Sequence, residues 1–150
     1  MDNNILKPGK FGHIAVVVKN LEETLDTYCK HLKLDRPLVK MTGEPQTAKV
    51  EYLGKPTPAR AKQAFLQLGP FRVEFLEPDG NPSTWQEFLD TQGEGIHHIS
   101  VEVENMEDAL DELSKCGMPL IQKGSYNGGQ YAYLDSMGQF KFMIELLKND

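Results

Sequence analysis

The chain has 150 residues, 39% of them hydrophobic, and no apolar run approaches the roughly 20 residues that a membrane-spanning helix needs. Its net charge of -6, with acidic and basic residues interspersed, argues against nucleic acid as a partner. The start "MDNNILKPGK" has no apolar signal region, and Cys29 and Cys116 have no CxxC spacing, so we expect a cytoplasmic protein with reduced thiols.

The first clear pattern begins at Gly12, where "GHIAVVVKNLEETLDTYCKHL" predicts a strand followed by a helix. Asn20 is the expected N-cap of this helix, and Glu23 is an acidic residue in its first turn. Apolar residues then recur at helical spacing, at Leu21, Leu25, Tyr28 and Leu32. This segment is the first half of a pattern that returns later in the chain.

Two further strands, "QAFLQLG" and "FRVEFLEP", follow and are joined tightly at Gly69-Pro70. The stretch before them, residues 40–60, is rich in proline and lysine and is expected to be part strand and part loop. After them, "DGNPSTWQEFLDTQGEG" predicts a linker with a short helix at Ser83–Leu89. Residues 10–80, approximately, thus form one strand-helix-strand module.

The pattern repeats from His97, in "HHISVEVENMEDALDELSKCG". His98 lies 85 positions after His13, and the same offset aligns the two predicted helix caps, Asn20 and Asn105. The closing strands "QYAYLDS" and "FKFMIELL" complete the second copy, and there Glu145 lies 71 positions after Glu74. The shorter offset indicates that the first copy carries extra residues, which we place within residues 40–60.

The predicted fold class is therefore α+β, with two βαβββ modules in a single domain spanning residues 1–150. We expect module 1 at about residues 10–80, a linker helix at about 82–92 and module 2 at about 95–148. Each of four polar residues interrupts an apolar strand at an equivalent place in the two modules: His13, Glu74, His98 and Glu145.

Side chains alternate along a strand, so the apolar neighbours of these four residues are expected to pack under the helices while the four face a sheet-lined cavity. A carboxylate buried there is costly unless it is paired or bound to a cation. Mixed nitrogen and oxygen ligands suit zinc, cobalt, nickel, manganese or iron(II). The pattern predicts one divalent metal site. His97 aligns with Gly12, one residue off the ligand position, and is expected to face away from His98 in a supporting or structural role.

The chain resembles the vicinal oxygen chelate superfamily of glyoxalases, bleomycin-resistance proteins and dioxygenases. The resemblance covers nearly the whole chain and is strongest in "GHIAVVVKNLEETLDTY", "VEFLEP", "GEGIHHISVEVENMEDALDEL" and "FMIELL". It implies a cupped mixed sheet around a metal held by His13, Glu74, His98 and Glu145, and a homodimer. The metals expected first are Zn, Co or Ni, with Mn, Mg or Fe as alternatives.

Within that superfamily, "GEGIHHI" and "VEFLEP" look most like methylmalonyl-CoA epimerase. The expected activity is that of a metal-dependent isomerase or epimerase that moves a proton next to a polarised carbonyl of an acyl thioester or small carbonyl compound. Glu145 is the first candidate for the base and Glu51 the second, and Arg72 is the candidate for binding an acidic substrate group. By strand parity, Ala15, Val17, Ser100, Met143 and Leu147 are expected on the cup face.

Three other functions remain open from the sequence. A glyoxalase I-type lyase would use the same metal chemistry on a hemithioacetal. An iron(II) dioxygenase usually needs two histidines and one carboxylate, so Glu74 counts against it. A protein that only binds a drug or metabolite in the cup is the non-catalytic alternative. Two segments differ from the epimerase pattern and keep these alternatives in view: "LDSMGQF" in the last hairpin and the long "GKPTPARAK".

Overall fold

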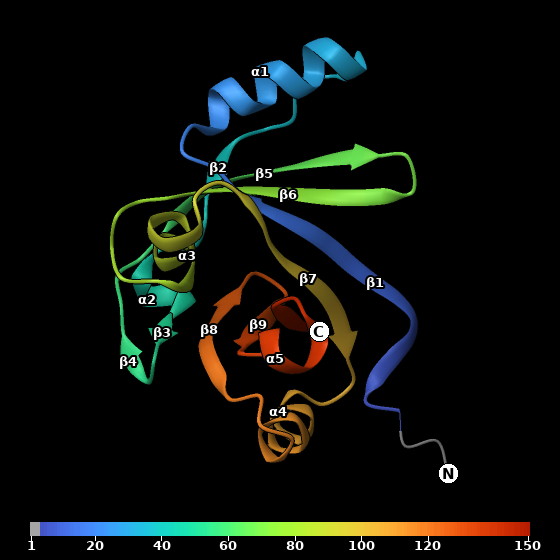
Figure 1. Cartoon of the computed structure of the whole chain (residues 1–150), viewed down its shortest axis with the longest axis vertical. Helices are drawn as coiled ribbons and strands as arrows, with labels where there is room; N and C mark the ends of the chain where they lie inside the picture. Colours follow the sequence, from blue (N-terminus) through green and yellow to red (C-terminus); the bar gives the residue numbers. More distant parts are fainter. Residues whose placement is uncertain (1–3) are drawn as a thin grey trace.

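A ten-stranded mixed sheet runs through the molecule, which the computed structural model describes for residues 4–150 (Figure 1). The strands are β1 (Leu6–Val17), β2 (Lys40–Met41), β3 (Glu51–Tyr52), β4 (Lys55–Pro56), β5 (Ala61–Leu68), β6 (Phe71–Pro78), β7 (Gly95–Val103), β8 (Leu120–Tyr126), β9 (Gly129–Leu134) and β10 (Ile144–Asn149). The helices are α1 (Leu21–Leu32), α2 (Pro45–Ala48), α3 (Thr84–Gln92), α4 (Met106–Lys115) and α5 (Met137–Phe140).

The two halves of the chain place their strands in the same relative order. The sheet order is β2-β5-β6-β1-β7-β10-β9-β8-β3-β4, so four strands of each half meet at the antiparallel pair β1–β7. In each half the first strand lies parallel to the last, β1 to β6 and β7 to β10. The sheet curls into a half-barrel with α1 and α4 at opposite ends of the view (Figure 1). The predicted α+β fold with a cupped mixed sheet is confirmed.

The extra residues of the first half lie where the sequence placed them, between β2 and β5. They form the short helix α2 and the hairpin of β3 and β4. This hairpin pairs with β8, which belongs to the second half of the chain, with Glu51 opposite Lys123. The insertion therefore crosses from one edge of the sheet to the other and extends the second module.

Three apolar clusters hold the layers together. Val18, Leu21 and Phe75 belong to the cluster that α1 covers, and Met106, Ala109 and Leu146 to the one that α4 covers. The third cluster lies inside the cup, where Ala15, Val17, Ala61, Leu76, Trp85 and Tyr133 pack together. The predicted caps are also present, because Asn20 and Asn105 each accept a backbone N–H at 3.1 Å, from Glu23 and Asp108. Across residues 4–150, no helix is long and apolar enough to cross a membrane.

Candidate metal centre

Two equivalent β-bulges place the histidines of the cluster. On β7, His98 pairs with Ala15 and Ile96 with Val16, so His97 is an extra residue in that strand. On β1, Gly12 and His13 together lie opposite Ser100. A bulge leaves two residues facing one and re-aims their side chains. The repeated pattern of the sequence thus contains a repeated irregularity, and both histidines of the cluster lie in it.

Ser100 and Gly12 complete the bulge on β1. The backbone N–H of His13 donates to Ser100 Oγ at 2.6 Å, and this hydroxyl donates to the carbonyl oxygen of His13 at 3.2 Å. A Cβ added to Gly12 would overlap the Ser100 hydroxyl. Glycine at residue 12 therefore lets the serine approach, and the serine satisfies the backbone groups that the bulge removes from the sheet ladder.

The four residues predicted from the repeat converge on one point. His13 Nε2 lies 3.1 Å from His98 Nε2, 3.3 Å from Glu74 Oε1 and 3.2 Å from Glu145 Oε1. His98 Nε2 lies 3.6 Å from Glu74 Oε1 and 3.3 Å from Glu145 Oε1. At most 5% of any of the four residues is exposed. The structure therefore brings together two imidazoles and two carboxylates away from bulk water.

These distances fit a shared cation. Four nitrogen and oxygen ligands arranged tetrahedrally at the usual 2.0–2.2 Å from a divalent metal lie about 3.3–3.6 Å from one another. His13, Glu74 and His98 each offer a ligand atom within 4.8 Å of the others, and Glu145 Oε1 approaches both histidine nitrogens. Glu145 Oε1 is buried and receives no directed hydrogen bond from the described residues, although both histidine nitrogens lie within 3.3 Å of it, and such a position is costly for a carboxylate oxygen. The donor set and this unpartnered atom could both be satisfied by one divalent ion.

Without a metal, the cluster holds a proton instead. Burial lowers the pKa of His13, but its contacts with Glu145 and Glu74 outweigh burial and raise the pKa to about 10. Burial favours the neutral form of Glu145, yet the neighbouring imidazoles of His98 and His13 hold its pKa well below the ordinary range. Protonated His13 thus partly neutralises the buried carboxylates.

Gln63 is a neighbour of the cluster that the sequence reading missed. Its Nε2 donates to Glu74 Oε2 at 2.5 Å, so Glu74 keeps Oε1 for the two histidines. The signal was present in the hairpin, because the tight turn at Gly69-Pro70 sets a register that pairs Phe65 with Glu74 and puts Gln63 on the same face. A register count from the turn would have found it.

His97 does not face away from His98, and that expectation was wrong. The two Nδ1 atoms lie 2.7 Å apart, and both rings are buried. Strand alternation failed here because the bulge puts the two consecutive side chains on one face. Burial, and then the neighbouring His98, lower the pKa of His97 to about 3, so its ring is neutral.

The cluster opens onto a cavity of about 700 Å³. His13, Glu74 and Glu145 line it, as do Phe65 and Tyr131. Arg72 and Lys40 contribute positive charge to the wall, and the Arg72 guanidinium lies 3.9 Å from the centre of the Phe65 ring. The structure thus places Arg72 beside the cluster, in a position to meet an anionic group.

Fewer of the residues expected on the cup face line the cavity than strand alternation predicted. Leu147 lines the cavity, but Ala15, Val17 and Met143 pack in the apolar cluster around Trp85, and Ser100 is used by the bulge. The linker helix α3 supplies Trp85, whose Nε1 donates to Tyr133 Oη at 3.1 Å. One part of the cup face is therefore solid core, and residues of the insertion, such as Thr42, Thr47 and Val50, line the remaining space.

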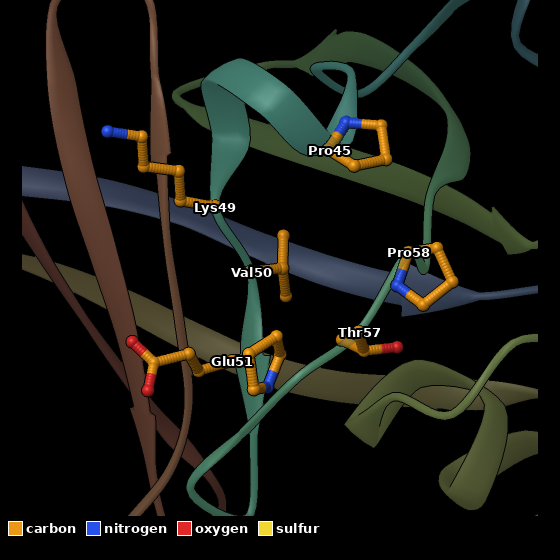
Figure 2. A pocket seen from close by; sticks show the side chains of 7 residues that line it. Pro45, Lys49, Val50, Glu51, Thr57 and Pro58 are labelled. Carbon is orange, nitrogen blue, oxygen red and sulfur yellow. The ribbon is translucent and has the colours of Figure 1, made fainter.

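Glu51, the second candidate base, lies elsewhere. It lines a separate depression beside Pro45 and Pro58, and its carboxylate lies 3.6 Å from Lys123 Nζ on β8. Figure 2 shows Val50 and the Glu51 carboxylate on opposite sides of the chain, and Val50 is the one that also lines the cup. The structure does not bring Glu51 to the cluster, because strand alternation at β3 turns it outward.

Known proteins resemble this chain in sequence. Residues 12–133 match the model of the Glyoxalase/Bleomycin resistance protein/Dioxygenase superfamily. The mitochondrial methylmalonyl-CoA epimerase of Dictyostelium discoideum is 32% identical over 106 residues, 70% of this chain and 55% of that protein. The corresponding Mus musculus protein is 29% identical over 112 residues, 74% of this chain and 55% of that protein. The chain therefore spans about half the length of these curated relatives.

Solved structures share the fold. A hypothetical protein of Bacillus halodurans is 26% identical with a TM-score of 0.66, and the match covers 96% of each chain. The methylmalonyl-CoA epimerase of Mycobacterium tuberculosis is 16% identical with a TM-score of 0.64, over 100% of this chain and 93% of that one. A methylmalonyl-CoA epimerase in complex with methylmalonyl-CoA has a TM-score of 0.62 at 14% identity, over 97% of this chain and 96% of that one.

Proposed function

The chain belongs to the Glyoxalase/Bleomycin resistance protein/Dioxygenase superfamily, and from this premise we propose that it is a metal-dependent epimerase that moves a proton at the carbon next to a thioester carbonyl. The observation that carries the proposal is the buried cluster of two histidines and two glutamates that opens onto a cavity. Similarity to methylmalonyl-CoA epimerases over about 70% of the chain supports the reaction class.

In this proposal His13, Glu74, His98 and Glu145 hold one divalent ion, with Zn, Co or Ni expected first. The bound ion would act as a Lewis acid on a substrate carbonyl, which makes the neighbouring C–H more acidic. Gln63 holds Glu74 through Oε2, and all four ligand residues are buried.

Glu145 is the residue we propose as the base. Gln63 donates to Oε2 of Glu74, whereas in Glu145 Oε1 is the oxygen that lies against the histidines, and no hydrogen bond among residues 4–150 holds its second carboxylate oxygen. Glu145 also lines the cavity, so its carboxylate can meet a substrate carbon there.

The cavity supports an anionic acyl thioester as the substrate class. Arg72 and Lys40 lie on its wall, and within the described chain no carboxylate forms an ion pair with either of them. A carboxylate or phosphate on the substrate would therefore find unused positive charge beside the cluster. A cavity of about 700 Å³ suits the acyl end of such a molecule.

The test is proton exchange at the substrate carbon. The protein, loaded with zinc, cobalt or nickel in turn, is incubated in D₂O with methylmalonyl-CoA, and the C2 proton is followed by NMR against a protein-free control. Exchange together with interconversion of the two epimers supports the proposal. If neither occurs with any metal, and the hemithioacetal of methylglyoxal and glutathione is consumed instead, the lyase alternative replaces it.

Metal binding should release a proton. Zinc binding at neutral pH is expected to release about one proton per chain, because a ligating imidazole must be neutral while His13 is protonated up to a pKa of about 10. The apparent affinity should consequently rise about tenfold per pH unit until the pH approaches that pKa. Calorimetric titrations in buffers of different ionisation enthalpy measure the release.

The same shift makes the metal-free protein sensitive to alkali. In the folded protein the pKa of His13 is raised from 6.5 to about 10. Protonated His13 therefore stabilises the fold fully below about pH 6.5, and this stabilisation is lost as the pH rises through about 10. Thermal unfolding of the metal-free protein should therefore shift to lower temperature over this interval.

For the calorimetric titrations with zinc, a heat of binding that does not depend on the buffer would contradict the assignment of this proton to His13.

A further inference from the structure

The bulge on β7 gives one histidine of the cluster a partner that the other lacks. Gly12 and His97 occupy the same place in the two repeats, directly before His13 and His98. At the first place the space is filled by the Ser100 hydroxyl. At the second the residue opposite is Ala15, which has no hydroxyl group to fill that space. The two repeats therefore differ at this position, because the first has a glycine there and the second a histidine.

The contact between the two adjacent histidines has a required direction. Their Nδ1 atoms lie 2.7 Å apart, so one must donate a proton and the other must accept it. His98 Nε2 points into the cluster, 3.3 Å from Glu145 Oε1. If this nitrogen is to offer its lone pair to a metal, neutral His98 must carry its proton on Nδ1. His97 Nδ1 is then the acceptor.

The rest of the chain of hydrogen bonds is consistent with that direction. With Nδ1 as acceptor, neutral His97 carries its proton on Nε2, and this N–H donates to Thr84 Oγ1 at 3.3 Å. The Thr84 hydroxyl then donates to Met143 Sδ at 3.7 Å. Each donor has an acceptor, and the chain ends at a group that only accepts.

Packing fixes the His97 ring in this place. His97 is 3% exposed, and the rings of Phe88 and Tyr133 contact it edge-on, each with centroids 5.3 Å away. Thr84 begins helix α3, and its N–H donates to the buried side-chain oxygen of Gln122 at 2.8 Å. The linker helix thus holds the far end of the hydrogen-bond chain.

We propose that His97 is a positioning residue that holds His98 in the tautomer whose Nε2 lone pair faces the cluster. This inference rests on the proposed metal site. Outer partners of ligating histidines fix ring orientation and tautomer, and their loss typically weakens metal binding by about 10- to 100-fold. Without an acceptor at residue 97, His98 can place its proton on Nε2 instead and point it at a carboxylate of the cluster.

The test compares His97→Leu with His97→Asn. Both remove the ring, but the Asn side-chain oxygen lies near the place of Nδ1 and can accept the proton of His98, whereas Leu cannot. Zinc affinity, measured by competition with a chelator, should fall about 10- to 100-fold in His97→Leu and stay within a few fold of wild type in His97→Asn. Long-range ¹H–¹⁵N NMR of the zinc-loaded proteins should show the Nδ1–H tautomer of His98 in wild type and in His97→Asn.

The outcomes separate this inference from the proposed function. If the wild-type protein binds no zinc, cobalt or nickel, the proposed metal site has failed. If wild type binds zinc and His97→Leu binds it equally well, or if zinc-loaded wild type carries the His98 proton on Nε2, only the role of His97 has failed. Thermal unfolding of the metal-free variants is the folding control. A purely structural role would make the buried Asn at least as harmful as Leu, which is the opposite of the expected order of affinities.

Discussion

Replacing Glu145 by Gln is expected to lower the rate of proton exchange on methylmalonyl-CoA by about 10²- to 10⁴-fold, the range that a positioned acid–base group contributes. The carboxamide has nearly the same shape but cannot take up the proton. Glu145 is chosen because it lines the cavity and, unlike Glu74, has no hydrogen bond among the described residues that holds its second carboxylate oxygen. Exchange is measured by NMR in D₂O at saturating metal, so that weaker metal binding does not lower the measured rate.

Glu51→Gln is the matched control for this experiment. Glu51 pairs with Lys123 outside the cup, so its variant should exchange the substrate proton at the wild-type rate. Metal content, measured on the same samples, separates loss of the base from loss of a ligand. A large loss of exchange in Glu51→Gln with an unaffected Glu145→Gln would overturn the assignment of the base.

His98→Ala should abolish stoichiometric metal binding. The wild-type protein is expected to bind about one divalent ion per chain, and loss of a ligand should cost more than the roughly 100-fold that supporting residues cost. His98 is fully buried, and its Nε2 lies within 3.6 Å of a ligand atom from each of the other three residues. Elemental analysis after dialysis against zinc measures the bound ion.

His31→Ala is the control for zinc held by histidines elsewhere. His31 is exposed in the last turn of α1, so its loss should leave the stoichiometry near one. Circular dichroism and thermal unfolding show whether His98→Ala still folds. Should a folded His98→Ala retain about one tightly bound zinc per chain, the four-residue site is not where the metal binds.

Much of the fold and most of the candidate cluster could be predicted because the chain repeats itself. The offset of 85 residues pairs His13 with His98, and the shorter offset of 71 pairs Glu74 with Glu145. Within one module the helix depends on residues close together in the chain. The second module repeats the same order of strands, so each copy supports the assignment of the other. The caps at Asn20 and Asn105 lie where the sequence placed them, since a cap depends only on its own helix.

Predictions based on strict strand alternation were less successful. His97 was expected to face away from His98, but an extra residue in β7 puts the two rings on one face. A bulge exists only in the pairing with another strand, here β1, where His98 lies opposite Ala15. Gln63 was missed for a related reason, because its contact with Glu74 depends on the register of the β5–β6 hairpin.

The two-module architecture and the four side chains that could share a cation were thus predictable before any coordinates, because both follow from local periodicity and internal duplication. The surroundings of these four side chains depend on the packing of the folded chain. Trp85 fills part of the cup, the insertion carries Glu51 to the edge of the second module, and the linker helix supports His97 through Thr84. Each of these depends on contacts between segments far apart in the chain, whose packing sets the final position of a side chain.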